Sequence, residues 1–366
     1  MMKYISNGDY KHDAPTNTGV LLCNLGTPEA PTVDAVRRYL AEFLSDPRVI
    51  ETSKIIWWPI LHGFILRTRP KRSAEAYQQV WTENGSPLLD ISIKQVAKIS
   101  GRLSEFVRGP VHTELGMRYG KPSIVSALEK LRSANVQRLL IFPLYPQYSA
   151  TTTASVFDAV TDTLKTWRWI PEVRMIDNYH DDEAYIGALA QTVRDHWAGN
   201  NKADKLLFSF HGLPKKYFHA DDPYFCECQK TARLIAENLN LDGEDWQVSF
   251  QSQIGVLKWL KPYTESTLKQ LGKQGVESVD ILCPGFSADC LETLEEISVR
   301  NRSYFLQAGG KRFTYIPALN DQSSHIAVLT ELIIKHCHGW LEFSDNWSEE
   351  KVTKKLAMSE ERTLPN

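Results

Sequence analysis

The 366-residue sequence lacks several features that mark common classes of protein. It has no excess of positive charge, with 42 Lys and Arg against 44 Asp and Glu, so we expect no general nucleic-acid-binding function. No run approaches the roughly 20 apolar residues that a membrane-spanning helix needs. The opening residues are polar and lack the apolar core of a secretion signal, which predicts a cytoplasmic protein.

Cysteine is sparse as well, with six residues in the whole chain. In a chain without a secretion signal we expect these thiols to be reduced. Only Cys226 and Cys228 are close in sequence, and their one-residue gap differs from the two-residue gap typical of zinc knuckles. We therefore expect no structural metal there. The glycine turn that follows residues 19–25 lacks the GxGxxG pattern, so no dinucleotide site is expected either.

Short apolar runs alternate with amphipathic segments along most of the chain, which predicts parallel sheets flanked by helices. The length favours two domains. We predict two similar α/β, Rossmann-like domains, of the kind found in chelatases, whose parallel sheets face each other across a cleft. The expected bounds are 19–178 and 179–323, with a helix at 324–340 packing back on the first domain and disorder at 1–18 and 344–366.

Residues Ile55 to Leu66, IIWWPILHGFIL, form the most apolar segment and are followed at once by Arg67, Arg69, Lys71 and Arg72. Twelve residues are too few to span a bilayer. Apolar and aromatic side chains beside cations suit a segment that touches an anionic membrane surface. The alternative is a buried helix whose last turn is stabilised by positive charge.

Chemistry-bearing side chains follow two of the predicted strands in the second half. His211 ends the apolar run in LLFSFHGLP, where Gly212 and Pro214 stop the strand. Ligands of open α/β sheets bind at this edge, although a histidine that simply packs at the edge of the core is an alternative. Four acids follow a later strand: Asp289, Glu292, Glu295 and Glu296.

A helix that starts near Asp289 would place Glu292 and Glu296 on one face, with Asp289 at the N-cap. Acids in a first helical turn also occur simply because they favour the helix dipole. An imidazole facing carboxylates can bind a divalent metal such as Fe(II), Co(II) or Zn(II), or it can act as a general base near neutral pH. The residues alone leave both roles open.

The chain from about Val20 to Trp340 resembles the ferrochelatases, which insert Fe(II) into protoporphyrin IX in the last step of haem synthesis. Seven segments carry the resemblance in order: NLGTPEAP at 24–31, GMRYG at 116–120, PLYPQYS at 143–149, FSFHGLP at 208–214, FQSQIG at 250–255, WLKP at 259–262 and CPGFSADCLETLEEI at 283–297. The last segment is similar to the enzymes of Gram-negative bacteria in particular. The resemblance implies a lyase with protoporphyrin and Fe(II) as substrates.

The resemblance also implies roles for single residues. The family's invariant histidine and glutamate fall on His211 and Glu292, which would bind the metal or take the two pyrrole protons that leave as it enters. The walls of the porphyrin pocket would be Leu25, Ser86, Arg118, Tyr119, Tyr148 and Trp259. Among these, Arg118 and Ser86 would serve the propionates or metal entry, and Trp259 would stack on the ring.

Three positions depart from patterns found in parts of the family. A histidine that some members carry two residues before the glutamate is Cys290 here. Animal members bind a [2Fe–2S] cluster, but the internal cysteine position is Ala150 here and no cysteine follows Cys337, so we expect no cluster and no cofactor beyond the substrate Fe(II). Arg300 interrupts the acidic row of other members, which weakens the case for a second metal site.

Two alternatives stay open at this point. The chain can be a chelatase for another tetrapyrrole, such as coproporphyrin or a cobalt-taking corrin precursor. It can also be a non-catalytic carrier of haem or porphyrin, although a carrier has no use for both His211 and Glu292.

Overall fold

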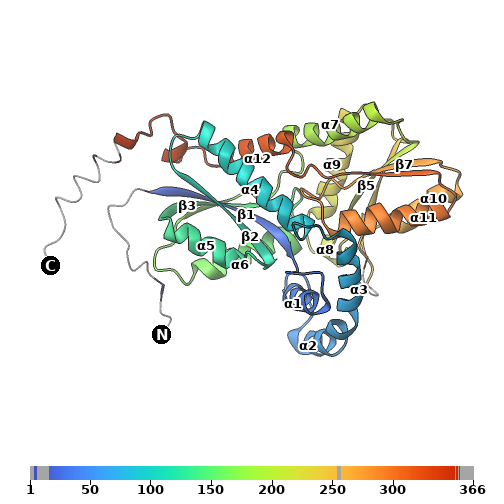
Figure 1. The fold of residues 1–366 in the computed structure, drawn as a ribbon, viewed down its shortest axis with the longest axis horizontal. Helices are drawn as coiled ribbons and strands as arrows, with labels where there is room; N and C mark the ends of the chain where they lie inside the picture. Colours follow the sequence, from blue (N-terminus) through green and yellow to red (C-terminus); the bar gives the residue numbers. More distant parts are fainter. Residues whose placement is uncertain (1–3, 6–15, 254–256, 351, 353, 355–366) are drawn as a thin grey trace.

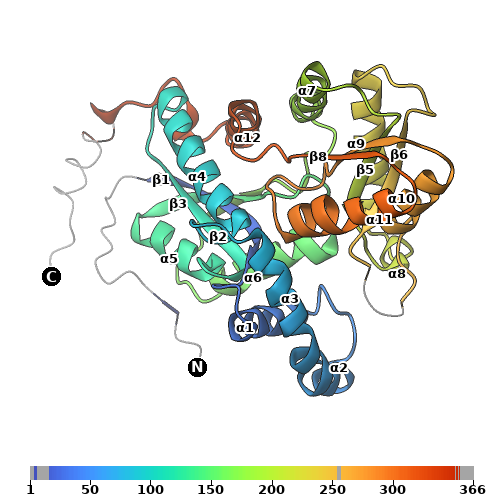
Figure 2. The ribbon, with the colours of Figure 1, turned by 45° about the vertical axis from the view of Figure 1, so that its right-hand side comes forward.

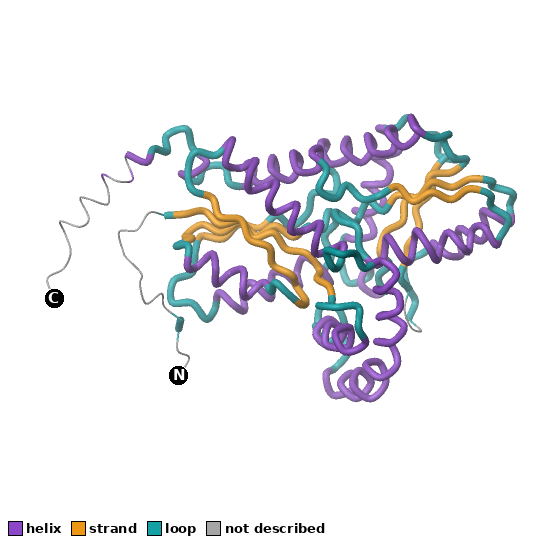
Figure 3. Tube along the Cα trace, in the orientation of Figure 1, coloured by secondary structure: helices purple, strands orange, loops and turns teal. Residues whose placement is uncertain are grey.

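The computed structural model describes residues 4–5, 16–253, 257–350, 352 and 354. They form two separate four-stranded parallel sheets, as the tube in Figure 3 shows. The first has the order β2-β1-β3-β4, with β1 Asn17–Thr27, β2 Val111–Gly120, β3 Val136–Pro143 and β4 Glu172–Met175. The second has the order β6-β5-β7-β8, with β5 Lys205–His211, β6 Trp246–Gln251, β7 Ser278–Leu282 and β8 Arg312–Ile316. The predicted fold class is confirmed.

Helices cover both faces of the first sheet, because alternate side chains of a strand point to opposite faces. In β1, Leu21 and Cys23 pack with residues of α5 (Ile124–Ser133) and α6 (Ser155–Leu164). Val20 and Leu22 pack on the other face with residues of α4 (Pro87–Phe106) and α12 (Ser323–His336). Figure 1 shows α4 and α12 on one side of this sheet and α5 and α6 on the other.

The second sheet is covered in the same way. Phe208 and Phe210 of β5 pack with residues of α7 (Glu183–Gly199) and α9 (Tyr224–Asn238), whereas Leu207 packs with residues of α10 (Thr264–Lys273) and α11 (Arg302–Gln307). The helix that precedes α11 is a π-helix, η3 (Glu292–Asn301). Because β5 lies inside its sheet between β6 and β7, its carboxyl end is held from both sides.

The end of the chain returns to the first sheet. α12 contacts α4 and β3 as well as α7, and a single apolar cluster that includes α12 joins residues from both sheets. Beyond it, the short helix η4 (Leu341–Phe343) carries Glu342, which accepts hydrogen bonds from Thr18 and Arg138 of the first sheet. The division between residues 178 and 179 falls in the loop before α7 and stays our proposal for the domain boundary.

A helical lobe projects from the first sheet, made of α1 (Val33–Leu44), α2 (Lys54–Ile60), the π-helical turn η1 (Leu61–Ile65) and α3 (Leu66–Val80). Figure 2 shows α2 at the far end of this lobe. No residue of α2 is buried, and Ile55, Trp58 and Phe64 have exposed fractions of 86%, 64% and 66%. The alternative of a buried helix is therefore wrong. None of the helices in the described part of the chain is both long and apolar enough to cross a bilayer.

Several element bounds differ from the expectation. β1 begins at Asn17, and β2 runs on to Gly120 because Thr27 pairs with Gly120 at the far end of the ladder. A short helix, α8 (Lys215–Phe218), follows β5 directly. The expected disorder at 1–18 and 344–366 lies largely outside the described residues, as does part of the segment 250–255.

Candidate active site

His211 is the last residue of β5 and is paired in register with Gln251, the last residue of β6. Its ring atom Nδ1 lies 2.7 Å from the carbonyl oxygen of Gly212. A carbonyl can only accept, so Nδ1 carries the hydrogen of this bond. In the neutral imidazole the lone pair is therefore on Nε2, where a proton or a metal ion can be bound.

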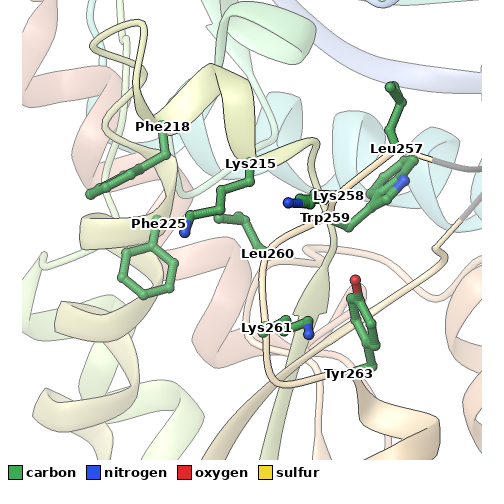
Figure 4. Close-up of a pocket in the computed structure, with 9 residues that line it drawn as sticks. All are labelled: Lys215, Phe218, Phe225, Leu257, Lys258, Trp259, Leu260, Lys261 and Tyr263. Carbon is green, nitrogen blue, oxygen red and sulfur yellow. The ribbon is translucent and has the colours of Figure 1, made fainter.

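Gly212 allows the chain to turn closely around this point. A Cβ at that position would lie 2.7 Å from the carbonyl oxygen of Gln251 and 3.4 Å from Cε3 of Trp259. The indole of Trp259 therefore packs against the residue that follows His211. Trp259 also lines a pocket of about 510 Å³, shown in Figure 4, with three lysines and apolar or aromatic side chains: Lys215, Lys258, Lys261, Phe218, Phe225, Leu257, Leu260 and Tyr263.

Glu292 begins η3, and its backbone carbonyl accepts a hydrogen bond of 2.9 Å from Nε2 of Gln251. Through Gln251, the structure joins the two site residues that the sequence places 81 positions apart. The expected N-cap role of Asp289 is wrong, because no side chain caps η3. The buried Asp289 carboxylate instead accepts from the hydroxyls of Thr293 and Tyr315, and it also accepts from the Asn320 amide.

The remaining acids of the row are engaged elsewhere. Glu296 accepts from the backbone N–H of Ser252 at 2.8 Å and from its hydroxyl at 2.6 Å. Glu295 is buried and forms an ion pair with Arg300. Arg300, which interrupts the family's acidic row, thus neutralises one of its members. Among the three glutamates at the start of η3, Glu292 is the one that neither Arg300 nor Ser252 engages.

The Glu292 carboxylate faces side chains from the helical lobe, since α3 packs against η3. Burial, followed by the charge of Glu292, raises the pKa of Tyr77. Burial also raises the pKa of Tyr39, and electrostatic repulsion from Tyr77 and Glu292 raises it further. Burial lowers the pKa of Arg69, and the negative charge of Glu292 opposes that shift. The carboxylate is therefore within electrostatic range of two buried phenols and one guanidinium, and it also forms a hydrogen bond with the Cys290 side chain.

Leu25 and Ser86 lie on the same side as these phenols. Leu25 is half-buried and packs, as Leu291 does, against the apolar cluster of the lobe, and it also packs against the cluster that contains Cys290. Ser86 is buried, precedes α4, and accepts a hydrogen bond of 2.8 Å from the hydroxyl of Thr27. Leu25 thus lies near the segment that precedes η3, whereas Ser86 is joined to the end of β1.

Arg118 and Tyr119 are held by a buried carboxylate. Asp46 Oδ2 accepts from Arg118 Nη2 at 2.5 Å, from the Tyr119 hydroxyl at 2.7 Å and from the Ser155 hydroxyl at 2.6 Å. The guanidinium also lies 4.6 Å from the Tyr119 ring centroid. Tyr119 is 1% exposed, so its ring is packed in the apolar cluster of the lobe. Arg118 is thus paired within the protein.

Tyr148 belongs to the loop between β3 and the π-helical turn η2 (Ala150–Ala154). Its backbone N–H donates to Glu227 Oε2 at 2.6 Å, and burial raises the pKa of its phenol. Glu227 belongs to α9, so the second half of the chain positions this predicted wall residue of the first half.

Several residues that organise the site were not predicted from sequence, namely Tyr39, Asp46, Arg69, Tyr77 and Gln251. For Gln251 a signal existed, because a polar residue ending a buried strand beside another strand-end group marks the ligand edge of a sheet. Asp46 and the two tyrosines had no such signal. In the described part of the chain, no group of three or more His, Cys, Asp or Glu side chains is placed to hold a metal ion.

Comparison with known proteins supplies independent findings. The family model for ferrochelatase matches residues 17–337. The chain is 52% identical over 363 residues to a ferrochelatase of Nitrosococcus oceani, covering 99% of this chain and 98% of that protein. It is also 52% identical to a ferrochelatase of Thioalkalivibrio sulfidiphilus, covering 93% and 92%.

Among solved structures, SirB from Bacillus subtilis with Fe3+ matches with a TM-score of 0.53 at 12% identity, covering 90% of this chain and 100% of that one. At that identity the likeness concerns the fold alone.

Proposed function

The chain belongs to the ferrochelatase family, and on that premise we propose which of its residues insert Fe(II) into protoporphyrin IX. The enzyme is a lyase of haem biosynthesis that exchanges two pyrrole protons for one metal ion. The observation that carries the proposal is the connection of His211 to Glu292 through Gln251. The connection links the strand end that carries the imidazole to the helix start that carries the carboxylate, which supports a role for both at one edge of the second sheet.

His211 acts at Nε2. Its Nδ1–H is engaged by the Gly212 carbonyl, so the lone pair of the neutral ring is available to an incoming proton or metal. Pyrrole nitrogens must lose their protons as the metal enters, and a base beside the ring lowers that barrier. A neutral imidazole is also a weak enough ligand to hand Fe(II) on.

Glu292 acts as the partner of His211. Its charge acts on Tyr39, Tyr77 and Arg69, and within the described residues it forms no ion pair of the kind that Glu295 forms with Arg300. A half-buried carboxylate of this kind can take up the second proton or share the metal.

The porphyrin contacts are proposed residue by residue. Trp259 lies against Gly212 and can stack on a ring whose nitrogens reach His211. Leu25 packs against the same apolar cluster as Leu291 and supplies an apolar wall on that side of the pocket. Arg118 and Ser86 provide polar groups for the propionates or for metal entry, and Tyr148 completes the wall. Tyr119, which is 1% exposed, contributes from behind the wall by supporting Arg118. Because Asp46 already pairs with Arg118, a propionate at that guanidinium has to share it.

The helical lobe is proposed to touch the membrane from the cytoplasmic side. The exposed side chains Ile55, Trp58 and Phe64 lie together on α2 and η1, and the exposed cations Arg67 and Lys71 follow on α3. An apolar surface flanked by positive charge is what binds an anionic lipid interface. The macrocycle of protoporphyrin is apolar, so contact with lipid would give this substrate a short path to the enzyme.

The direct test is anaerobic incubation with Fe(II) and protoporphyrin IX, following the Soret band. We expect metallation by the wild type and a loss of about 10²-fold or more for His211→Ala, the range for removal of a general base. His219→Ala is the matched control, because His219 is exposed and lies after α8. Equal rates for His211→Ala and wild type would refute the assigned role of His211.

A further inference from the structure

Asp222 is a buried carboxylate that joins the Tyr148 loop to the segment after β5. Its Oδ2 accepts from the Ser149 hydroxyl at 3.0 Å and from the backbone N–H of Ala150 at 2.8 Å. Its Oδ1 accepts from the backbone N–H of Tyr224 at 3.0 Å. Asp222 is 9% exposed and Ser149 is fully buried, so water competes little for these bonds.

Tyr224 carries the connection on to His211. Its hydroxyl donates a hydrogen bond of 2.9 Å to the backbone carbonyl of His211. The N–H of the same peptide, that of Gly212, donates to the Gln251 carbonyl at 2.8 Å. The peptide between His211 and Gly212 is therefore held on both sides, by Tyr224 at its C=O and by Gln251 at its N–H.

The orientation of this peptide determines where the imidazole lies. His211 Nδ1 bonds the carbonyl of Gly212, the group next along the chain, so a rotation of the held peptide would move that carbonyl away from the ring. Once released, the ring can exchange its hydrogen between Nδ1 and Nε2. The Nε2 lone pair would then be lost in part of the molecules.

We propose that Asp222 and Tyr224 are positioning residues that hold His211 in its Nδ1–H form and couple it to the loop that carries Tyr148. The inference rests on the proposed role of His211. The hydrogen bonds that support it run from Ser149 and Ala150 through Asp222 and Tyr224 to the His211 carbonyl. Neither Asp222 nor Tyr224 touches the reacting atoms. Groups that orient a functional histidine in this way typically contribute about 10- to 100-fold to activity or metal affinity.

The first test is Tyr224→Phe, which removes a single hydroxyl. We expect kcat to fall about 10-fold while the KM for protoporphyrin changes less than about 2-fold, because porphyrin contacts remain. We also expect ¹⁵N NMR of the histidine-labelled enzyme, with the His211 signal assigned from His211→Ala, to change from one tautomer to a mixture. A merely structural tyrosine would lower Tm and leave the kcat and the tautomer unchanged.

Tyr185→Phe is the matched control. Tyr185 is fully buried, and its hydroxyl donates to the Pro284 backbone carbonyl at 3.0 Å, so the same bond type is lost at another strand end. We expect a fall in Tm comparable to that of Tyr224→Phe and an unchanged His211 tautomer. Equal tautomer changes in both variants would overturn the proposal.

Asp222→Asn tests the coupling. If Asp222 acts through Tyr224, the double variant Asp222→Asn/Tyr224→Phe loses no more kcat than the more impaired single variant. If the losses of kcat in the two single variants add up in the double variant, Asp222 does not act through Tyr224. The tautomer measurement needs no turnover, so it separates a failed relay from a failed role of His211: in the latter case His211→Ala stays active while the Tyr224→Phe tautomer still shifts.

Discussion

Gln251 and Glu292 are joined by a hydrogen bond in which Nε2 of the glutamine donates to the backbone carbonyl of the glutamate at 2.9 Å. The Oε1 atom of the same Gln251 side chain accepts from the Ser209 hydroxyl at 2.7 Å, and its backbone is paired with His211. One buried amide thus sets the distance between the strand that bears the histidine and the helix that bears the glutamate.

Gln251→Met should separate these two elements. The variant keeps the volume of the side chain but loses its hydrogen bonds with Ser209, Cys283 and Glu292, so we expect kcat to fall about 10- to 100-fold. Gln95→Met is the control, since Gln95 is fully buried and also donates to backbone carbonyls, those of Ser287 and Asn320. Comparable kcat losses in the two variants would show that Gln251 matters only for stability.

Glu292→Gln should abolish most activity without unfolding the protein. The amide keeps the shape of the carboxyl but can neither take a proton nor hold Fe(II), so we expect kcat to fall about 10²- to 10⁴-fold. Glu295→Gln, on the same helix, should lower Tm by weakening the pair with Arg300 while leaving most of the kcat. Circular dichroism and the Soret assay on both variants check the prediction.

Trp58→Ser with Phe64→Ser should weaken binding to anionic vesicles. These side chains are 64% and 66% exposed, and burial of a large apolar side chain contributes about 1.5–3 kcal/mol, so we expect at least a 10-fold lower affinity in co-sedimentation. Phe106→Ser, at a ring that is 59% exposed on α4, is the control. Added salt should weaken wild-type binding as well. Unchanged sedimentation of the double variant would refute membrane contact at this lobe.

Glu227 should make the protein less stable as the pH rises from about 4.5 to about 7. Burial raises its pKa from an ordinary 4.5 to about 7, with nearby carboxylates adding to the shift. Between these values the unfolded chain has released the proton and the folded chain retains it, so stability falls as pH increases and is fully present only below about pH 4.5.

The Glu227→Gln variant isolates this contribution. The amide can still accept from the Tyr148 N–H but has no proton to lose, so its Tm should rise relative to wild type as the pH goes from 5 to 8. His180, 3.4 Å from Glu227, has a pKa lowered by burial and acts in the opposite sense, but it is present in both proteins and largely cancels in the difference. A Tm difference that does not change with pH would contradict the assignment.

Glu342→Gln should destabilise the fold and leave the chemistry intact. The carboxylate is fully buried, and both of its oxygens accept from Arg138 Nη1 at 2.7 Å. Removing one partner of a buried ion pair costs about 3–5 kcal/mol, so we expect a lower midpoint in urea with an unchanged kcat at 25 °C. Glu350→Gln, in an exposed pair with Lys354, should change the midpoint little.

Local sequence patterns determined the two parallel sheets and the position of His211 at the end of a strand. A short apolar run bounded by turn residues, such as Leu206 to Phe210, is the pattern that predicts a strand buried on both faces. The order of strands and helices then implies parallel pairing. The segment 283–297 pointed to Glu292 through its resemblance to one family. Each of these features is encoded by residues that are neighbours along the chain.

What only the tertiary structure decided depends on contacts between distant segments. Glu295 and Glu296 looked equivalent to Glu292 in sequence, and they differ because Arg300 and Ser252 engage them. The apolar run of α2 fitted both a buried and an exposed helix, since periodicity does not say whether a partner covers it. Gln251 and Glu292 meet because separate elements of the second half pack together. Hydrogen bonds between elements have no local pattern, so the sequence supplied the reacting groups while the packing selected and oriented them.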